Sequence, residues 1–235
     1  MRKIEEFDLI IRNGMIYDGS GDPPFIGDIA IKDDLIAAIG SLEQATSKMN
    51  IDATNLAVGP GFINMLSWAV ESLIEDGRSC SDIMQGVTLE VFGEGWSWGP
   101  LNDSMKQEMI ERQADIKYDI TWTTLAEYLD FLVTKGISPN ISSFVGATTV
   151  RIHALGYEDR KPTPEEMEKM KALVNQAMLE GALGVASALI YPPAFYADTD
   201  ELIELCKVVA KYDGLYISHL RSEGAQFLEA IDEFL

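Results

Sequence analysis

The chain has 235 residues, of which 47% are hydrophobic and 24% are charged. This composition is typical of a globular protein with a sizeable apolar core. Acidic residues outnumber basic ones by 38 to 18, which gives a net charge of −20. A charge of this sign repels nucleic acid and anionic lipid, so we expect no nucleic-acid partner and no membrane partner.

The first part of the chain, residues 1–60, predicts a small all-β domain. Two apolar runs at 9–11 and 15–17 flank the Asn13-Gly14 pair. An Asn-Gly pair between apolar runs is a strong hairpin signal, because both residues tolerate the positive φ angles of a tight turn. We therefore expect two paired strands joined at this position.

Residues 61–235 alternate between strand-like and helix-like patterns. The strand-like apolar runs are 62–66, 88–92, 141–145, 183–186 and 215–218. Repeated strand–helix units predict a parallel sheet with right-handed crossovers. The fold class is therefore α/β, with about five of the eight βα units that close a (β/α)8 barrel of the TIM type.

Two helix starts carry clear local signals. Thr124 and Glu127 have the spacing of a capping box, in which each side chain bonds to the backbone of the other residue. Thr163 and Glu166 repeat this spacing, and Pro164 occupies the first helical position, where its missing N–H has no cost. We expect helices to begin at both sites.

The N-terminus and the cysteines indicate in which cellular compartment the protein is expected. The first six residues contain no apolar segment of the signal-peptide type, and no later window approaches the length of a membrane span. The two cysteines, Cys80 and Cys206, are far apart in the sequence, which fits a reducing compartment. We expect a cytoplasmic protein, although a removed signal peptide would leave no trace.

Several motifs, in a consistent order along most of the chain, resemble one family. These motifs are residues 8–14, 18–21, 60–64, 85–88, 180–184, 189–193, 196–202 and 218–224. Together they resemble the D-aminoacylase (N-acyl-D-amino-acid deacylase) branch of the amidohydrolase superfamily. A single short match would be weak, but this many in order is specific.

The resemblance implies a fold and an activity. Members combine a β-sandwich, completed by both chain ends, with a (β/α)8 barrel, and they use zinc to hydrolyse the amide of a small N-acylated D-amino acid. Residues 1–60 would then be part of the β-sandwich, and 61–235 the first part of the barrel. A full-length member is about twice this length, so we expect the general base and a further histidine ligand beyond Leu235.

The expected metal site is incomplete in this chain. Leu66 and Trp68 stand where the family has a His-x-His pair, and Gly95 stands where relatives carry a bridging cysteine. None of these three side chains can bind a metal ion. We therefore expect one zinc ion at most rather than two.

The remaining candidate ligands are His219 and Glu94. His219 follows the last strand-like run, at the end of the strand where barrel enzymes place their reactive groups. The resemblance implies metal ligation by its neutral imidazole, and the alternative is a hydrogen-bonded core histidine. Glu94 is a carboxylate ligand or a loop residue that accepts backbone hydrogen bonds, with Glu90 as a second choice. The other histidine, His153, matches no family ligand.

Five residues are candidates for substrate binding. Tyr191 and Tyr196 lie on a proline-rich loop and would donate hydrogen bonds to the developing oxyanion, or simply pack. Arg221 and Ser222 would hold a substrate carboxylate. Glu223 would orient Arg221 or the histidine. A structural Arg221–Glu223 pair is an equal alternative.

Two classes of function follow. The first is a metal-dependent amidohydrolase acting on an N-acylated D-amino acid. The second is a catalytically silent scaffold, favoured by the missing His-x-His pair. A third variant is a half-barrel that needs a complementing chain or self-association, because five strands would leave exposed sheet edges.

Overall fold

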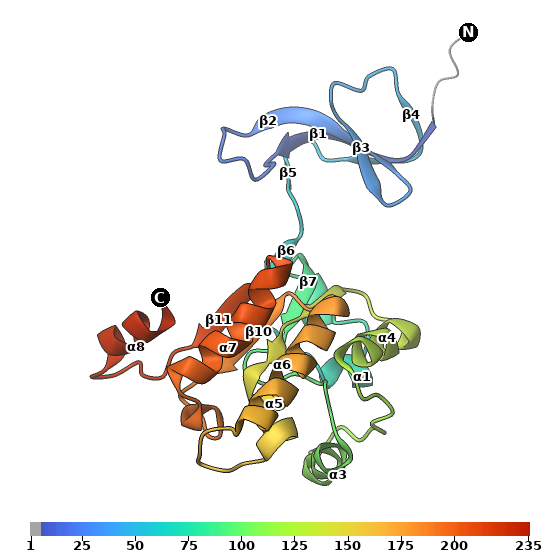
Figure 1. The fold of residues 1–235 in the computed structure, drawn as a ribbon. Coiled ribbons are helices and arrows are strands. Elements are labelled where there is room, and N and C mark those ends of the chain that lie inside the picture. Colours follow the sequence, from blue (N-terminus) through green and yellow to red (C-terminus); the bar gives the residue numbers. More distant parts are fainter. Residues whose placement is uncertain (1–5) are drawn as a thin grey trace. The chain divides into compact units, whose positions relative to one another are not determined.

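The computed structural model describes residues 6–235. The chain divides into two compact units, Met1–Gly61 and Phe62–Leu235 (Figure 1). The first unit is all β, and the second combines parallel strands with helices. The predicted α/β class is therefore confirmed.

The first unit is built on one five-stranded sheet. Its strands are β1 (Glu6–Ile16), β2 (Phe25–Lys32), β3 (Leu35–Gly40), β4 (Thr46–Asp52) and β5 (Ala57–Val58). The order is β3-β2-β1-β4, and β5 also pairs with β1. Within residues 6–61 the strands form this one sheet, so the described residues do not supply a second layer of a β-sandwich.

The predicted hairpin at Asn13 is wrong. Asn13 has φ 59° but lies inside the continuous strand β1, where the pairing with β2 shifts register between Ile11 and Gly14. Its backbone N–H donates to Asp28 Oδ1 at 2.9 Å. An Asn-Gly pair supplies positive φ to a bulge as readily as to a turn, so the local signal did not distinguish the two.

The second unit contains two three-stranded parallel sheets, ordered β6-β7-β8 and β11-β10-β9. The strands are β6 (Phe62–Asn64), β7 (Val87–Phe92), β8 (Asn140–Ser143), β9 (Val145–Gly146), β10 (Gly184–Ala188) and β11 (Leu215–His219). All five predicted strand positions are confirmed, with one break at Phe144. Since only Phe144 separates β8 from β9, residues 140–146 contribute to both sheets.

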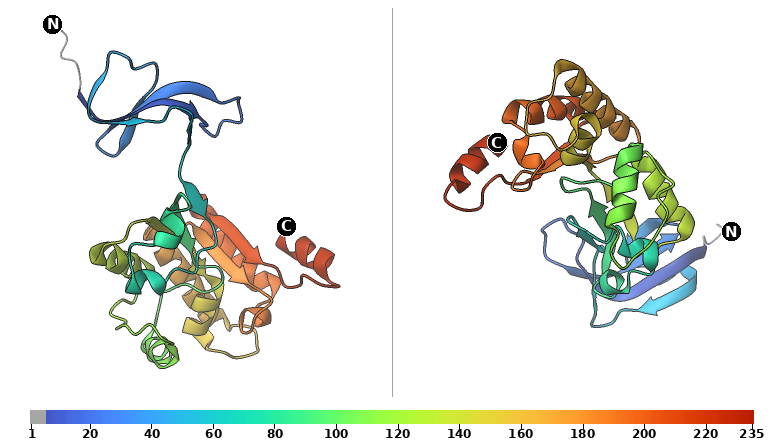
Figure 2. Two further views of the ribbon diagram at one scale, coloured as in Figure 1. Left: turned by 180° about the vertical axis from the view of Figure 1, so that it is seen from behind. Right: turned by 90° about the horizontal axis from the view of Figure 1, so that it is seen from below.

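Helices connect the strands. They are α1 (Ser72–Glu75), α2 (Cys80–Ile83), α3 (Asp103–Arg112), α4 (Leu125–Lys135), α5 (Ala147–Leu155), α6 (Pro164–Leu179), α7 (Thr199–Val209) and α8 (Phe227–Phe234), with short 3-10 turns η1 (Ala194–Tyr196) and η2 (Ala210–Tyr212). Both predicted capping boxes form, at Thr124 and Thr163. Helices α5, α6 and α7 pack in sequence against one another (Figure 2).

Strand β10 buries side chains on both of its faces. Val185 packs in the cluster under α5, α6 and α7, whereas its neighbour Ala186 packs with Val91 and Phe144 on the other face. This alternation follows from the two-residue period of a strand. Across residues 6–235, no helix is both long and apolar enough to cross a membrane.

Candidate functional site

The candidate site lies where three strands end. Glu94 follows β7, Ala188 ends β10, and His219 ends β11, directly beside Ala188 in the parallel register. In parallel sheets the carboxyl ends of neighbouring strands meet at one edge, which is where α/β enzymes place their reactive groups. The structure therefore brings both predicted metal ligands, His219 and Glu94, to the same edge.

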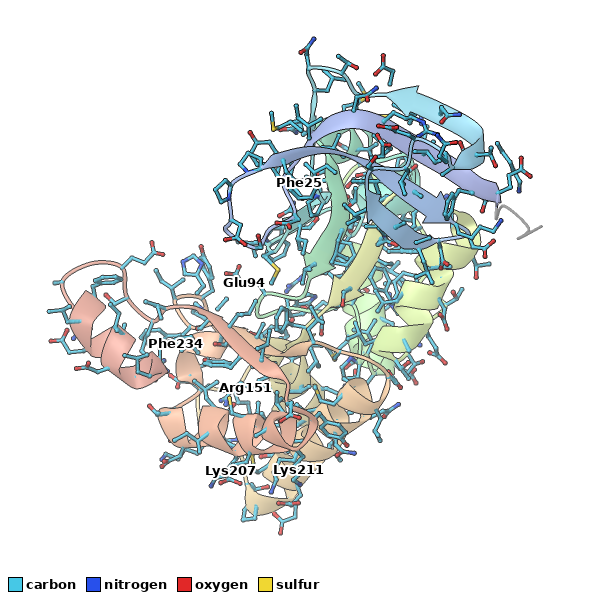
Figure 3. All side chains as sticks on the ribbon, turned by 90° about the horizontal axis from the view of Figure 1, so that it is seen from above. Phe25, Glu94, Arg151, Lys207, Lys211 and Phe234 are labelled. Atoms are coloured by element: carbon cyan, nitrogen blue, oxygen red, sulfur yellow. The ribbon has the colours of Figure 1, made fainter. Side chains whose placement is uncertain are left out.

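His219 lies between two carboxylates. Its Nδ1 is 3.7 Å from Glu94 Oε1, and its Nε2 is 3.2 Å from Glu223 Oε1. The carboxylate of Glu94, which is labelled in Figure 3, is largely buried, whereas that of Glu223 is exposed. Of the two groups that Glu223 was predicted to orient, the one it lies beside is the histidine, while Arg221 pairs with Glu233.

Tyr191 borders the imidazole, and Tyr196 does not. The ring centroids of Tyr191 and His219 are 5.4 Å apart with an interplanar angle of 67°, an edge-on contact. Tyr191 is held by a hydrogen bond from its backbone N–H to Ala188 O at 3.1 Å. Tyr196 ends the turn η1, and among the described residues it does not line the cavity beside Glu94.

A cavity of about 290 Å³ opens beside Glu94. The described residues that line it include one acidic side chain, Glu94, and one basic side chain, Arg112. Its aromatic lining residues are Trp68, Trp96, Tyr157 and Tyr191. Small-molecule sites commonly combine apolar walls with a few placed polar groups.

The loop that carries Glu94 depends on the next residue being glycine. Gly95 has φ +68°, and a Cβ built there would lie 2.7 Å from Ala188 Cβ and 2.9 Å from Ala188 N. The backbone is further fixed because Thr148 N donates to Gly95 O at 3.0 Å. A cysteine at position 95 would therefore require this loop and β10 to move apart, which gives a packing reason for the missing ligand.

Leu66 and Trp68 follow strand β6. Both side chains are about half exposed, and Trp68 also lines the cavity beside Glu94. They contribute apolar surface to this region and no metal ligand.

The guanidinium of Arg221 is bonded to Glu233 and to two backbone carbonyls and not to Glu223. Its Nε and Nη2 donate to the two carboxylate oxygens of Glu233 at 2.8 Å, and its Nη1 and Nη2 donate to Phe195 O and Ala197 O, also at 2.8 Å. The Glu233 carboxylate raises the pKa of Arg221, and Arg221 lowers the pKa of Glu233. The predicted substrate-binding role and the alternative Arg221–Glu223 pair are both replaced by this structural contact.

Ser222 also serves local structure. Its Oγ accepts a hydrogen bond from Gly224 N at 3.2 Å. It lines a small cavity with Arg221 and Glu233, and the described lining of that cavity does not include Glu94 or His219. The structure therefore does not place Ser222 in the candidate site.

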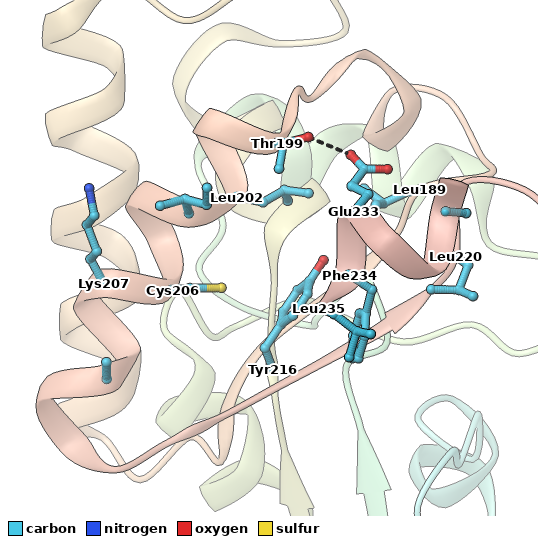
Figure 4. A pocket seen from close by; sticks show the side chains of 13 residues that line it. Leu189, Thr199, Leu202, Cys206, Lys207, Tyr216, Leu220, Glu233, Phe234 and Leu235 are labelled. Atoms are coloured by element: carbon cyan, nitrogen blue, oxygen red, sulfur yellow. Dashed lines mark hydrogen bonds between the residues drawn. The ribbon is translucent and has the colours of Figure 1, made fainter. Parts of the chain in front are cut away.

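A larger cavity of about 480 Å³ lies among α7, β11 and α8 (Figure 4). At its edge, Thr199 Oγ1 donates to Glu233 Oε1 at 3.0 Å. Its described lining is mostly apolar and includes neither Glu94 nor Tyr191, both of which line the smaller cavity. We therefore assign the chemistry to the smaller cavity.

Glu90, the second choice for a metal ligand, is fully buried away from the site. Ser67 Oγ and Ser79 Oγ each donate to its carboxylate at 2.7 Å. Its neighbours Leu89 and Val91 pack on the face that Phe144 occupies, so Glu90 points the other way. The two-residue alternation of a strand does not separate Glu90 from Glu94, because the two positions are four residues apart.

Sequence reasoning missed Arg112 and Tyr157. No motif marks either residue, and only the packing of α3 beside the loop after α5 brings them to the cavity. Tyr157 OH donates to Glu108 Oε1 at 2.7 Å. Burial, and then the Glu108 carboxylate, raise the pKa of Tyr157 to about 12, so this phenol stays protonated at neutral pH.

The donors near His219 fit a zinc ion in part. Two ligands bonded to one tetrahedral zinc ion at their usual bond lengths lie roughly 3.4 Å apart, close to the 3.7 Å between His219 Nδ1 and Glu94 Oε1. If Nε2 donates its proton to Glu223, the lone pair of Nδ1 faces Glu94. Among residues 6–235, however, no three His, Cys, Asp or Glu side chains are placed to hold a metal ion.

Comparisons with known proteins identify relatives, although no family model matches. D-aminoacylase from Alcaligenes xylosoxydans xylosoxydans is 33% identical over 233 residues, which cover 97% of this chain and 47% of that protein. The N-acyl-D-aspartate deacylase of the same organism is 31% identical over 230 residues, covering 97% of this chain and 46% of that protein. This chain thus spans about half the length of these curated relatives.

A solved structure of a deacylase also matches the fold of this chain. The N-acyl-D-glutamate deacylase from Bordetella bronchiseptica, complexed with zinc and a phosphonate inhibitor, superimposes with a TM-score of 0.85 at 27% identity. The match covers 98% of this chain and 48% of that one. Sequence motifs, fold and relatives agree that this chain belongs to the D-aminoacylase branch of the amidohydrolases.

Proposed function

We propose that this chain carries part of the active site of an enzyme that hydrolyses the amide bond of a small N-acyl-D-amino acid. The observation that carries the proposal is the placement of His219 between Glu94 and Glu223 at the carboxyl ends of the parallel strands. The relatives are named for deacylation of N-acyl-D-amino acids, which supports this substrate class.

We also propose the larger architecture. The five parallel strand positions correspond to the first strands of a (β/α)8 barrel, and the sheet of residues 6–61 to part of a β-sandwich. The support is the parallel order through β6, β7 and β8 and through β9, β10 and β11. The chain's match to about half of each relative agrees with a partial barrel.

His219 and Glu94 would hold a zinc ion, with Glu223 fixing the tautomer of the imidazole. When bound, zinc polarises the scissile carbonyl and lowers the pKa of water. The Tyr191 phenol, beside the imidazole, would donate a hydrogen bond to the carbonyl oxygen as negative charge develops on it. The aromatic walls of the cavity would limit the access of bulk water to the amide.

Catalytic zinc sites have three protein ligands, and the described residues bring two together. The proposal therefore assigns the third ligand and the general base to polypeptide outside this chain. A second candidate function is a catalytically silent scaffold, favoured by Trp68 in the lining of the cavity and by Leu66, since neither side chain can bind a metal ion.

Hydrolysis separates the two candidates. We expect the zinc-loaded chain, supplied with the polypeptide that completes its barrel, to release amino acid from N-acetyl-D-amino acids and not from their L-enantiomers. His219→Gln would abolish release, whereas His153→Gln, at the other histidine of the chain, would retain it. Equal activity in both variants would remove His219 from the mechanism, and no hydrolysis by the zinc-loaded preparation would favour the scaffold.

A further inference from the structure

Arg112 places a positive charge on the cavity that holds the candidate site. It is the last residue of helix α3, and it lines the cavity together with Glu94 and Tyr191. Among the described residues that line this cavity, Arg112 carries the only positive charge. An anionic group on a ligand would therefore be attracted to one defined part of the cavity.

The guanidinium is held in place from one side. Its Nη2 lies 2.6 Å from Glu108 Oε1, and its Cζ lies 5.9 Å from the ring centroid of Tyr157. Tyr157 OH donates to the same Glu108 oxygen at 2.7 Å. The aromatic contact and the shared carboxylate oxygen restrict where the guanidinium lies, which lowers the entropy lost when a ligand binds.

The other side of the guanidinium is available. The ion pair with Glu108 engages Nη2 of Arg112, and 70% of the Arg112 side chain is exposed. Arg221 differs, because its Nε, Nη1 and Nη2 all donate to protein oxygens. Of these two arginines, Arg112 is the one with donors to offer a ligand.

The lining around Arg112 indicates what else the ligand carries. Trp68, Trp96 and Tyr191 line the same cavity. Aromatic side chains contribute large apolar contact areas and pack well against flat apolar groups. A ligand that satisfies this lining has a carboxylate at one position and a flat or bulky apolar group close to it.

We propose that Arg112 binds the carboxylate of the N-acylated amino acid, with Trp68 and Trp96 beside an apolar, preferentially aromatic, amino-acid side chain. The inference rests on the proposed function, because it takes the amide of the same molecule to lie at Glu94 and His219. Under this proposal Arg112, rather than Arg221, makes the site prefer a substrate with a free carboxylate over one whose carboxylate is replaced by a neutral group.

Direct binding tests this assignment without hydrolysis. The probe is the ketone analogue of N-acetyl-D-phenylalanine, in which a methylene group replaces the amide nitrogen, so no amide bond is present to cleave. Its primary carboxamide is a neutral probe of the same shape. Isothermal titration calorimetry on the folded chain compares the two for the wild type, Arg112→Gln and Arg78→Gln.

The control removes the same charge from a comparable position. Arg78 is exposed and pairs with Asp76, and among the described residues it lines none of the cavities considered above. A charge-assisted hydrogen bond supports a preference of roughly tenfold or more for the carboxylate probe. We expect this preference in the wild type and in Arg78→Gln, and its loss in Arg112→Gln.

The outcomes are distinct. A carboxylate preference that survives in Arg112→Gln, or no binding of the carboxylate probe by the wild type, would overturn the assignment. A preference that depends on Arg112 would support it even if the zinc-loaded enzyme hydrolysed nothing, in which case only the proposed function would fail.

Discussion

Glu223 Oε1 lies 3.2 Å from Nε2 of His219, while the other ring nitrogen faces Glu94 Oε1 at 3.7 Å. An imidazole carries one proton when neutral, so one of its nitrogens then presents a lone pair. A lone pair that faces a carboxylate is unfavourable unless a cation lies between them. Two arrangements resolve this: a metal ion bound by Nδ1 and Glu94, or an imidazolium that forms ion pairs with both carboxylates.

The carboxylate of Glu223 should affect metal affinity without being a ligand. We expect Glu223→Gln to weaken zinc binding by about 10- to 100-fold, because a hydrogen bond to the remote ring nitrogen fixes the tautomer and raises ligand basicity. Competition with a chromophoric chelator measures the affinity. Glu229→Gln, an exposed carboxylate change on α8, is the control. Equal affinities in the two variants would show that Glu223 does not orient the histidine.

The loop at Gly95 should resist a side chain more strongly than its φ alone requires. Gly95 has φ +68° and would place a Cβ 2.7 Å from Ala188 Cβ, whereas Gly156 has φ +71° with no atom within 4 Å of the same position. We expect Gly156→Ala to cost about 1 kcal/mol of unfolding free energy, and Gly95→Ala to cost roughly 1–3 kcal/mol more. Urea denaturation measures both. Equal losses would rule out the clash.

The buried carboxylate of Glu90 depends on two serine hydroxyls. Ser79→Ala would remove the donor to one oxygen and leave that buried acceptor unsatisfied, at a cost of about 1–3 kcal/mol. Ser67→Ala would act on the other oxygen with a similar cost. Ser81→Ala, at an exposed position in α2, should change the unfolding free energy by less than about 0.5 kcal/mol. A Ser79→Ala protein as stable as Ser81→Ala would contradict this account.

The Arg221–Glu233 pair should make stability depend on pH. Because Arg221 lowers the pKa of Glu233 below its usual value of 4.5, the stabilising contribution is fully present above the unfolded-state pKa and is lost as the pH falls through the folded-state pKa. We expect wild type and Glu233→Gln to differ most in melting temperature at neutral pH, with the difference shrinking below about pH 4.5. In an Arg221→Gln background the difference should no longer follow this pH course.

Local signals predicted much of the second unit. The capping boxes at Thr124 and Thr163 involve residues three positions apart, so the sequence alone contains both partners. The strand positions were visible because apolar runs between turn residues recur along the chain. The Asn13-Gly14 pair misled because a positive φ serves both a turn and a bulge, and the pairing of distant strands decides between them.

The site itself was less predictable. His219 and Glu94 could be proposed because each lies at or just after the end of a strand, and strand ends converge at one edge. Arg221 was misassigned because its partner, Glu233, comes from a helix whose packing the sequence does not show. Arg112 was missed for the same reason, since only the packing of α3 brings it to the cavity.

The central claim is tested most directly by the zinc that the chain, supplied with the polypeptide that completes its barrel, retains after a chelator has stripped the metal, zinc has been added back and the excess has been dialysed away. We predict about one zinc ion per chain at neutral pH for the wild type and for His153→Gln. His219→Gln and Glu94→Gln should retain much less under the same conditions. Equal zinc content in all four proteins, or none in the wild type, would contradict a metal site at His219 and favour the imidazolium between two carboxylates.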